Sequence, residues 1–450
     1  MSVKETRVRF APSPTGPLHI GGVRTALYNY LFAKKNNGKF ILRYDDTDQE
    51  RSKEEFVLSI ASDLKWLNID HDETYFQSKR VDRYNQIFDQ LISKKLVYPC
   101  FESNEDLEIK KKLQLKAGKP PIYDREALNL TKEEIEKQIL SGSRPYWRFK
   151  LSQNKVQWTD LVKGKTEVDL SSQSDPVLRR ADGSYLYHFP SVVDDIDMKI
   201  THIIRGEDHL SNSAVHVEIF QSLDAQVPSF GHNPLMLNED GTKLSKRNVD
   251  SISIKKFKEE GYSTESILSY LYSVGLNADY SFKEISKNEY VDFDLSKISK
   301  NLPKLDLSKI DHFQKLALRT LSLKELLNEF NNLIDFEIKK NEWNLIKNNV
   351  EKYSDILELL EIIRRNKIEN SPSEDFIKLL VENIDKFDDL DFEEYTKQIS
   401  QLNTNITKKE IFINTRYLLT GNNNGPSVKD LFEYYGFNEI KNYLNEFKTL

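Results

Sequence analysis

The first 32 residues constrain the fold most, because they place a strand, a Pro/Gly-rich loop and a helix in immediate succession. Residues 8–12 have strand character, residues 13–17 form the loop, and residues 24–32 follow the pattern of a helix. A second strand is expected at residues 40–44, and the Ser-Lys-Glu-Glu pattern of residues 52–55 predicts a capping box that begins a second helix. This alternation indicates βαβ units and a parallel sheet.

The middle of the chain interrupts the alternation. Residues 96–183 mix a lysine-rich helix with two tryptophan-containing strands, and the Asp-Gly pair at 182–183 is typical of a tight hairpin turn. Strand character returns at residues 191–193 and 200–204. We therefore interpret residues 96–183 as an insertion between the two halves of a parallel sheet.

From about residue 255 onward the chain is predicted to be almost wholly helical. Capping boxes that begin at Ser322, Ser371 and Thr407 mark expected helix starts, each with a glutamate three residues later. The overall pattern is a parallel α/β region, an α+β insertion and an all-α C-terminal region.

Composition excludes several classes of protein. Hydrophobic residues make up 38% of the 450-residue chain, which is enough for about two to four domains. No apolar run approaches the roughly 20 residues of a membrane span. The single cysteine, Cys100, excludes a disulfide framework or a cysteine cluster for zinc within one chain and fits a reducing cytoplasm. Because no signal or transit pattern precedes the first strand, we expect a cytoplasmic protein, which we take to be a monomer without a membrane partner.

The net charge of −6 excludes a uniformly basic nucleic-acid-binding protein. A local basic face is still compatible with this charge, because attraction to phosphate acts over about 8–10 Å in physiological salt. Composition therefore neither requires nor excludes an RNA partner.

The loop after the first strand is the first candidate for chemistry. It contains the sequence His19-Ile20-Gly21-Gly22 and leads into a helix, where backbone N–H groups and the helix dipole favour phosphate. Adjacent glycines let a base or ribose lie against the backbone, and His19 can donate hydrogen bonds to an α-phosphate in the transition state. The segment is neither a Walker A loop nor the six-residue dinucleotide pattern. Taken alone, it could also be a turn with an incidental histidine.

A second candidate is the basic segment at residues 241–247. It places three cations in five residues behind a glycine, a pattern that can hold a polyphosphate leaving group. Taken alone, an exposed basic turn is the commoner outcome for such a run. The two segments are more informative together, because they occur in order with an insertion and further strands between them.

In this arrangement the chain resembles the class I aminoacyl-tRNA synthetases, whose HIGH and KMSKS signatures match the two segments. It resembles the bacterial type of glutamyl-tRNA synthetase more closely. The resemblance spans nearly the whole chain, densely to about residue 275 and sparsely afterwards. The segments that carry it are residues 9–16, 43–48, 187–195, 205–209, 243–247 and 416–426.

The resemblance implies roles for individual residues. The guanidinium groups of Arg9 and Arg205 suit carboxylates geometrically, and Asp45 supplies a negative charge near the amino group of the substrate. Catalysis by charge stabilisation is implied for His19, Lys243 and Lys246. Contacts with ATP are implied for Pro12, Gly21, Gly22, Asp208, Ser245 and Lys246. Contacts with glutamate are implied for Arg9, Ala11, Ser13, Asp45, Tyr187, Ser191 and Arg205.

The chain departs from the family pattern at four positions. Gly22 replaces the last histidine of HIGH, so His19 alone carries the imidazole role. Asp45 stands where the family usually has glutamate, and Ser191 stands where some members carry asparagine. Some relatives bind zinc in the insertion through several cysteines and a histidine, whereas Cys100 is alone, so no metal site is predicted.

The resemblance implies a glutamate–tRNA ligase that uses ATP with Mg²⁺, and its expected partners are L-glutamate and tRNA(Glu), with tRNA(Gln) open as a second acceptor. The implied fold is an α/β Rossmann-type parallel-sheet catalytic domain with an inserted α+β acceptor-binding domain and an all-α C-terminal region. The expected parts are a catalytic domain at 1–95 and 184–240, an acceptor-stem-binding insertion at 96–183, a loop and helical stem-contact region at 241–315, and an anticodon-binding region at 316–450.

Other functions remain alternatives at the level of the sequence. A glutaminyl-tRNA synthetase shares much of the core, but it typically has Asn where this chain has Asp48, and β-barrel anticodon domains. A tRNA-modifying glutamyl-transfer enzyme or a nucleotidyltransferase for a small acceptor would not need the long helical tail. A non-catalytic tRNA-binding paralogue would be suggested by loss of His19 or Lys246, and both are present.

Overall fold

The computed structural model describes residues 5–242, 244, 252–276, 293–366, 368–387 and 390–447. The chain divides into two compact units, Met1–Lys256 with Leu268–Asp306 and Phe257–Ile267 with Leu307–Leu450. The predicted phosphate-binding residues Lys243, Ser245 and Lys246 lie outside the described residues.

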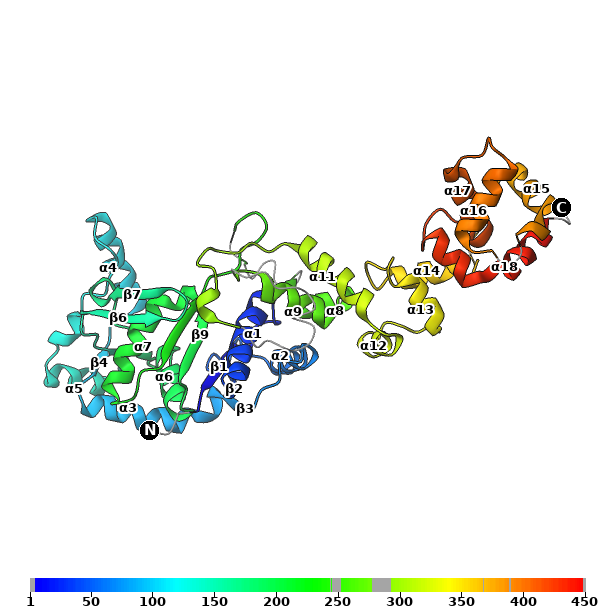
Figure 1. Cartoon of the computed structure of the whole chain (residues 1–450). Helices are drawn as coiled ribbons and strands as arrows, with labels where there is room; N and C mark the ends of the chain where they lie inside the picture. The colour runs from blue at the N-terminus through cyan, green and yellow to red at the C-terminus, as the bar shows by residue number, and fades with distance from the viewer. Residues whose placement is uncertain are drawn as a thin grey trace. The chain divides into compact units, whose positions relative to one another are not determined.

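The first unit is built on five parallel strands (Figure 1). The three N-terminal strands pair in parallel in sequence order, and the two later strands pair in parallel with each other. The N–H of Thr201 donates to the carbonyl of Arg7 at 2.9 Å, which sets β9 beside β1. The order is therefore β3-β2-β1-β9-β10, and it reverses between β1 and β9. The strands are β1 (Arg7–Phe10), β2 (Lys39–Tyr44), β3 (Glu73–Phe76), β9 (His202–Gly206) and β10 (Ser229–Asn233).

Helices connect these strands and supply the core. Helix α1 buries Val23, Leu27 and Leu31, which recur at a spacing of four residues and so lie along one face. A second cluster of buried side chains includes Phe88 and Phe189 from two further helices. Transfer of such side chains out of water, at about 1.5–3 kcal/mol each, holds the helices to the sheet. The helices of this layer are α1 (Ile20–Lys35), α2 (Glu54–Trp66), α3 (Val81–Ser93), α6 (His188–Asp197) and α7 (Leu210–Ser222).

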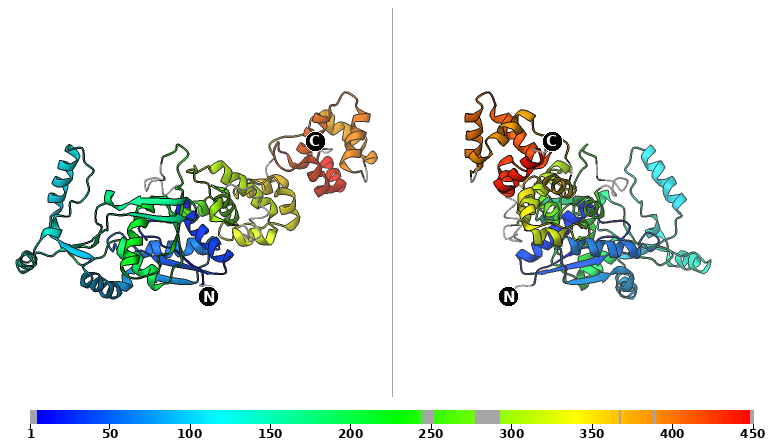
Figure 2. Two further views of the ribbon diagram at one scale, coloured as in Figure 1. Left: turned by 60° about the vertical axis from the view of Figure 1, so that its left-hand side comes forward. Right: turned by 90° about the vertical axis from the view of Figure 1, so that its right-hand side faces the viewer.

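The predicted insertion between β3 and β9 is mainly antiparallel. One small sheet has the order β4-β5-β8, and β6 with β7 forms a hairpin. The N–H of Leu161, at the end of β6, donates to the carbonyl of Phe230 in β10 at 2.8 Å, so the hairpin reaches the parallel strands. Helix α4 extends away from them (Figure 2). The elements are β4 (Val97–Cys100), α4 (Asn104–Lys116), α5 (Lys132–Leu140), β5 (Tyr146–Phe149), β6 (Lys155–Asp160), β7 (Gly164–Asp169) and β8 (Val177–Arg179).

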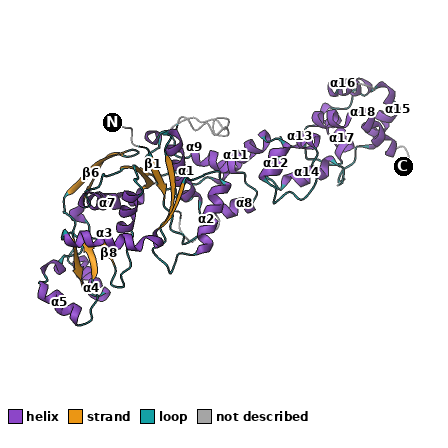
Figure 3. Cartoon of the chain, turned by 90° about the horizontal axis from the view of Figure 1, so that it is seen from below, coloured by secondary structure: helices purple, strands orange, loops and turns teal. Residues whose placement is uncertain are grey.

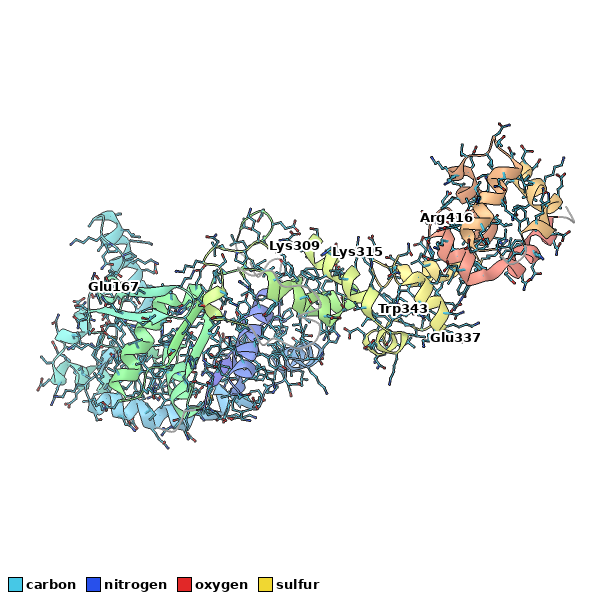
Figure 4. All side chains as sticks on the ribbon, in the orientation of Figure 1. Glu167, Lys309, Lys315, Glu337, Trp343 and Arg416 are labelled. Atoms are coloured by element: carbon cyan, nitrogen blue, oxygen red, sulfur yellow. The ribbon has the colours of Figure 1, made fainter. Side chains whose placement is uncertain are left out.

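The described part of the second unit is helical (Figure 3). Its core includes the fully buried Trp343, whose indole N–H donates to the carbonyl of Leu321 at 2.9 Å (Figure 4). Helices α8 (Ile254–Glu259) and α9 (Thr264–Ser273) run across the division between the units. The remaining helices are α11 (Leu307–Thr320), α12 (Leu323–Glu329), α13 (Lys340–Ile346), α14 (Asp355–Ile363), α15 (Glu374–Glu382), α16 (Phe392–Leu402), α17 (Lys408–Thr420) and α18 (Val428–Phe447).

Two of the four capping boxes are confirmed. The side chains of Ser322 and Thr407 each accept a hydrogen bond from the backbone N–H of the glutamate three residues later. The side chain of that glutamate accepts in turn from the backbone N–H of the cap residue. The prediction at residues 52–55 is wrong, because Lys53 is the N-cap of α2 and makes no side-chain cap. The prediction at Ser371 is also wrong, because Ser373 caps α15.

The strand expected at residues 191–193 is wrong, since these residues lie in helix α6. Residues 189–195 are all buried, so this short apolar segment shows no amphipathic period, and two adjacent valines mimic a strand. The hairpin turn at 182–183 is confirmed by an antiparallel bridge between Arg179 and Tyr185. The chain then enters α6 instead of continuing as a strand.

Candidate active site

A cavity of about 540 Å³ lies at the carboxyl ends of β1 and β9. The strand order reverses between these two strands, and ligands of open parallel sheets bind at such a point. The cavity is lined by ten of the predicted site residues, namely Arg9, Ala11, Ser13, His19, Gly21, Gly22, Asp45, Tyr187, Arg205 and Asp208.

Two predicted residues do not line this cavity. Pro12 faces β2 through its carbonyl, which accepts the N–H of Asp45 at 3.0 Å. Ser191 is buried in α6, and its hydroxyl has no hydrogen-bond partner among the described residues. Its carbonyl is 3.4 Å from Nη1 of Arg43. Ser191 therefore lies behind the pocket wall.

His19 is the N-cap of helix α1 and is held in one orientation. Its Nδ1 accepts the N–H of Gly22 at 3.2 Å, and burial lowers the pKa of the ring. A neutral ring whose Nδ1 is an acceptor carries its hydrogen on Nε2. Gly21 packs closely beside it, because a Cβ there would lie 3.2 Å from the imidazole. The loop therefore presents an N–H donor and a helix N-terminus to the cavity, which suits a phosphate.

The basic segment at residues 241–247 meets this loop through Leu244. Leu244 lines the cavity, and its side chain would lie 3.5 Å from a Cβ at Gly21. Farther on, Ser253 forms an antiparallel bridge with His19, and Ile254 donates to the carbonyl of Leu18 at 2.9 Å. Segments more than 200 residues apart in the sequence thus border one cavity.

Arg43 is the central residue that sequence reasoning missed. It is fully buried on β2, with Nε 2.7 Å from Asp45 and Nη1 2.7 Å from Asp195. Asp194 is 3.8 Å from the same guanidinium. Although burial opposes it, these carboxylates hold the pKa of Arg43 well above its usual value. Asp195 also accepts from Arg9 at 3.1 Å, so one carboxylate fixes two arginines of the pocket.

Asp45 is one of two acidic residues, with Asp208, among the described residues that line the cavity. Burial raises its pKa to about 6, although Arg43 acts in the opposite direction. The carboxylate is therefore ionised at neutral pH but costly to desolvate, and an ammonium group placed beside it would relieve that cost.

Arg205 differs from Arg9 and Arg43. It is only 6% exposed, and its guanidinium donates to two neutral groups, the hydroxyls of Tyr187 at 2.8 Å and Ser213 at 2.7 Å. Its Nε has no hydrogen-bond partner and no carboxylate forms an ion pair with it among the residues that the structure describes. Burial lowers its pKa. A buried cation on the wall of a cavity, with no direct ion pair among the described residues, is suited to an anionic ligand.

Other cavity residues also went unpredicted: Arg24, His209 and Asn233. Arg24 donates to the carbonyl of Pro234 at 2.8 Å, and a Cβ at Gly275 would lie 2.5 Å from its Nη2. Arg43 and His209 stand inside the segments that carry the family resemblance, which is the only signal that could have identified them.

The described residues contain no group of three or more His, Cys, Asp or Glu side chains that could hold a metal ion. In the same part of the chain, no helix is both long enough and apolar enough to span a bilayer.

Comparison with known proteins agrees with this geometry. Residues 5–312 match the family described as tRNA synthetases class I (E and Q), catalytic domain. The chain is 39% identical over 97% of its length to glutamate–tRNA ligase 2 of Bartonella bacilliformis, covering 99% of that protein. It is 41% identical to glutamate–tRNA ligase 1 of Rickettsia prowazekii, covering 96% of this chain and 97% of that one.

A solved structure is also similar over nearly the whole length. It is a glutamate tRNA ligase from Elizabethkingia meningosepticum, crystallised in complex with its amino acid. The two superpose with a TM-score of 0.83 at 29% identity, covering 98% of this chain and 99% of that one. The α/β fold with an inserted domain and a helical C-terminal region is thereby confirmed.

Proposed function

Because the chain belongs to the class I tRNA synthetases for glutamate and glutamine (E and Q), we propose that it is a glutamate–tRNA ligase, which attaches L-glutamate to the 3′ end of tRNA(Glu). The observation that carries the choice of an acidic amino acid is Arg205, a buried cation without a carboxylate partner among the described residues.

The charges of the cavity match those of glutamate. Arg205 and Arg9 bind the two carboxylates, since the N–H groups of a guanidinium make charge-assisted hydrogen bonds to a carboxylate. Nε and Nη2 of Arg9 already donate to Asp195, which leaves Nη1 for the substrate. Asp45 binds the ammonium group, and Tyr187 bounds the pocket beside Arg205.

The first step joins glutamate to AMP. An oxygen of the α-carboxylate attacks the α-phosphorus of ATP, which enters with Mg²⁺ as one substrate complex. An O–P bond forms, the bond between the α-phosphorus and its bridging oxygen breaks, and pyrophosphate leaves. Nε2–H of His19 and the N-terminus of α1 stabilise the charge on the α-phosphate, and Lys243 and Lys246 stabilise the leaving group. No side-chain nucleophile is required.

In the second step the 2′-hydroxyl of the terminal ribose attacks the activated carbonyl and AMP leaves. The insertion at 96–183 contacts the acceptor stem, and the helices at 316–450 contact the anticodon loop, where unstacked bases can be recognised by their edges. Arg416 on α17 is a candidate contact, because its single protein hydrogen bond in the described part of the chain is to the carbonyl of Asn424 at 3.3 Å (Figure 4).

Charging of purified tRNA(Glu) and tRNA(Gln) transcripts with radiolabelled glutamate and glutamine tests the proposal. We expect glutamate on tRNA(Glu), and glutamate on tRNA(Gln) would identify a second acceptor. Attachment of glutamine would contradict the substrate, and no charging of either tRNA would contradict the ligase.

A variant tests the basic segment. Lys246→Ala is expected to lower pyrophosphate exchange by about 100-fold or more, because it removes a charge from the leaving group. Lys246→Arg keeps the charge and serves as the control, and circular dichroism should show both variants folded. Unchanged exchange in Lys246→Ala would refute the role.

A further inference from the structure

Four buried side chains form a continuous chain of hydrogen bonds that ends at Arg205. Nη2 of Arg205 donates to Oγ of Ser213 at 2.7 Å, and Oγ of Ser213 is 2.7 Å from Nε2 of His232. Nδ1 of His232 is in turn 2.6 Å from Oδ2 of Asp160. None of the four is more than 6% exposed. The chain passes from the insertion through the edge strand β10 and helix α7 to β9.

The direction of each hydrogen bond follows from the two ends. Although burial opposes it, hydrogen bonds from His232 and from the N–H of Lys163 lower the pKa of Asp160 to about 2, so it can only accept. Burial lowers the pKa of His232 against the effect of Asp160, so the ring is neutral at pH 7. A neutral ring that donates from Nδ1 must accept at Nε2. The hydroxyl of Ser213 therefore donates its hydrogen to Nε2.

Ser213 has a second acceptor for its hydrogen, but it is poorer. The carbonyl of His209 is 3.2 Å from Oγ, compared with 2.7 Å for Nε2 of His232. With its hydrogen directed at His232, Oγ turns its lone pairs to Arg205. Asp160 is thus linked to Arg205 through two neutral groups, and among the described residues no carboxylate forms an ion pair with the guanidinium.

We propose that Asp160, His232 and Ser213 act as one positioning relay that orients Arg205 for the substrate carboxylate, so that the inserted β6–β7 hairpin helps to set the affinity for glutamate. The relay rests on the proposed function of Arg205 as a glutamate-binding residue. A direct aspartate contact would take N–H donors of Arg205 away from the substrate, as Asp195 takes Nε and Nη2 of Arg9. The relay holds the guanidinium and leaves its charge available.

Asp160→Asn is expected to reverse the direction of the hydrogen bonds made by His232, while the volume of the side chain changes little. Oδ1 of Asp160 accepts three backbone N–H groups, from Val162, Lys163 and His232, each at 3.0 Å. The asparagine oxygen must therefore take the Oδ1 position and the amide NH₂ the Oδ2 position. His232 then meets a donor at Nδ1 and moves its hydrogen to Nε2, and Ser213 loses the acceptor that oriented it.

The test compares three relay variants with a control. The relay variants are Ser213→Ala, Asp160→Asn and the double variant of these two, and the control is Ser222→Ala. Ser222 lies on the same helix, and its hydroxyl donates to the carbonyl of Ile219 at 2.8 Å, outside the relay. For each protein the Kd for glutamate is measured by calorimetry, and KM for glutamate and for ATP is measured in tRNA(Glu) charging. We expect each relay variant to weaken the binding of glutamate about tenfold, as loss of one hydrogen bond to a charged group does. The KM for ATP should stay within about twofold of the wild-type value.

The double variant gives the decisive result. If the three residues act as one unit, the double variant should bind glutamate no more than about twofold more weakly than Ser213→Ala alone, because the effects of coupled residues are not additive. An additive loss of about 100-fold, equal changes in the KM values for glutamate and ATP, or an unchanged Kd in Ser213→Ala would each overturn the relay. If the wild type binds glutamate but charges no tRNA, the ligase function fails, whereas the Kd values still decide for or against the relay.

Discussion

Two arginines in different units of the molecule differ in whether a carboxylate binds the guanidinium. This difference distinguishes an arginine that stabilises the fold from one that is suited to a ligand. Arg364, at the end of α14, donates from Nε and Nη2 to both oxygens of Glu342 at 2.8 and 2.7 Å and to the carbonyl of Glu337 at 2.8 Å. Arg205 is more deeply buried, yet it donates to neutral hydroxyls. The hydrogen bond to Glu342 raises the pKa of Arg364, whereas burial lowers the pKa of Arg205.

The difference teaches that the partners of a buried arginine are more informative than its burial. Arg364 has the carboxylate of Glu342 and the carbonyl of Glu337 as acceptors and joins α14 to α13. Arg205 is held in place without being neutralised, and that arrangement costs stability unless a ligand repays it. Arg364 can therefore be assigned to the fold.

The largest expected effect is that of Arg205→Met. Removing the uncompensated cation should lower kcat/KM for glutamate by about 1,000-fold, as expected for a truncated buried charge contact. The melting temperature should stay equal or rise, because an isolated buried charge is replaced by an apolar side chain of similar length. Activity and calorimetric melting are measured on the same preparation. A lowered melting temperature with retained glutamate binding would reverse the roles that we assign to the two arginines.

Arg364→Ala should give the opposite combination. It leaves the carboxylate of Glu342, which is 4% exposed, without its partner. A loss of about 2 kcal/mol in the free energy of unfolding is expected, because the penalty for a buried unpaired charge is reduced by the partial exposure of Arg364. Urea unfolding measures this loss, and KM for glutamate should not change. The double variant Arg364→Met with Glu342→Leu, which removes both charges, should recover most of the stability.

The carboxylates of the same two regions should respond to pH in opposite directions. Burial raises the pKa of Asp45 to about 6, and the hydrogen bond from Arg364 lowers the pKa of Glu342. Asp45 must be ionised to hold the substrate ammonium, so kcat/KM for glutamate should fall about tenfold from pH 7 to pH 5. Asp45→Asn should lack this dependence. A flat wild-type profile between pH 5 and 7 would contradict the assignment of Asp45.

For stability the signs are reversed between the two groups. Because the folded pKa of Asp45 lies above its unfolded value, its ionisation lowers stability as pH rises through roughly 4 to 6. Glu342 has a depressed folded pKa, so it contributes stability above its unfolded pKa, and that contribution is lost as pH falls through the folded value. Asp45→Asn and Glu342→Gln should remove these two slopes separately in acid titrations of unfolding.

Local patterns in the sequence were sufficient to predict the loop that contains His19 but not the charge network behind it. Residues 9–22 form a strand, a loop and a helix start in succession, so His19 and the glycines could be predicted from neighbours. The relay joins Asp160 to His232 and Ser213 to Arg205, across the boundary between insertion and sheet. Such pairings are fixed by tertiary packing, and no period or propensity records them.

The same limit explains why the sequence predicts a strand at residues 191–193, which are helical, and why Ser191 does not line the cavity. Inside α6 every residue from 189 to 195 is buried, so the helical period that would reveal the element is absent. Ser191 matches a family position in sequence, yet its hydroxyl is directed away from any partner in the described residues. A match by alignment gives the position of a residue along the chain but not the direction of its side chain.

The smallest expected effect distinguishes two capping boxes that look alike in sequence. In α17, Thr407 accepts the N–H of Glu410 at 3.2 Å and Glu410 bonds back at 2.8 Å. In α2 the cap is Lys53, and the hydroxyl of Ser52 has no hydrogen-bond partner in the described part of the chain. Thr407→Ala should therefore cost about 1 kcal/mol of unfolding free energy, whereas Ser52→Ala should change it by less than about 0.5 kcal/mol. Equal losses in urea unfolding would mean that both boxes form, and that Ser52 caps helix α2 after all.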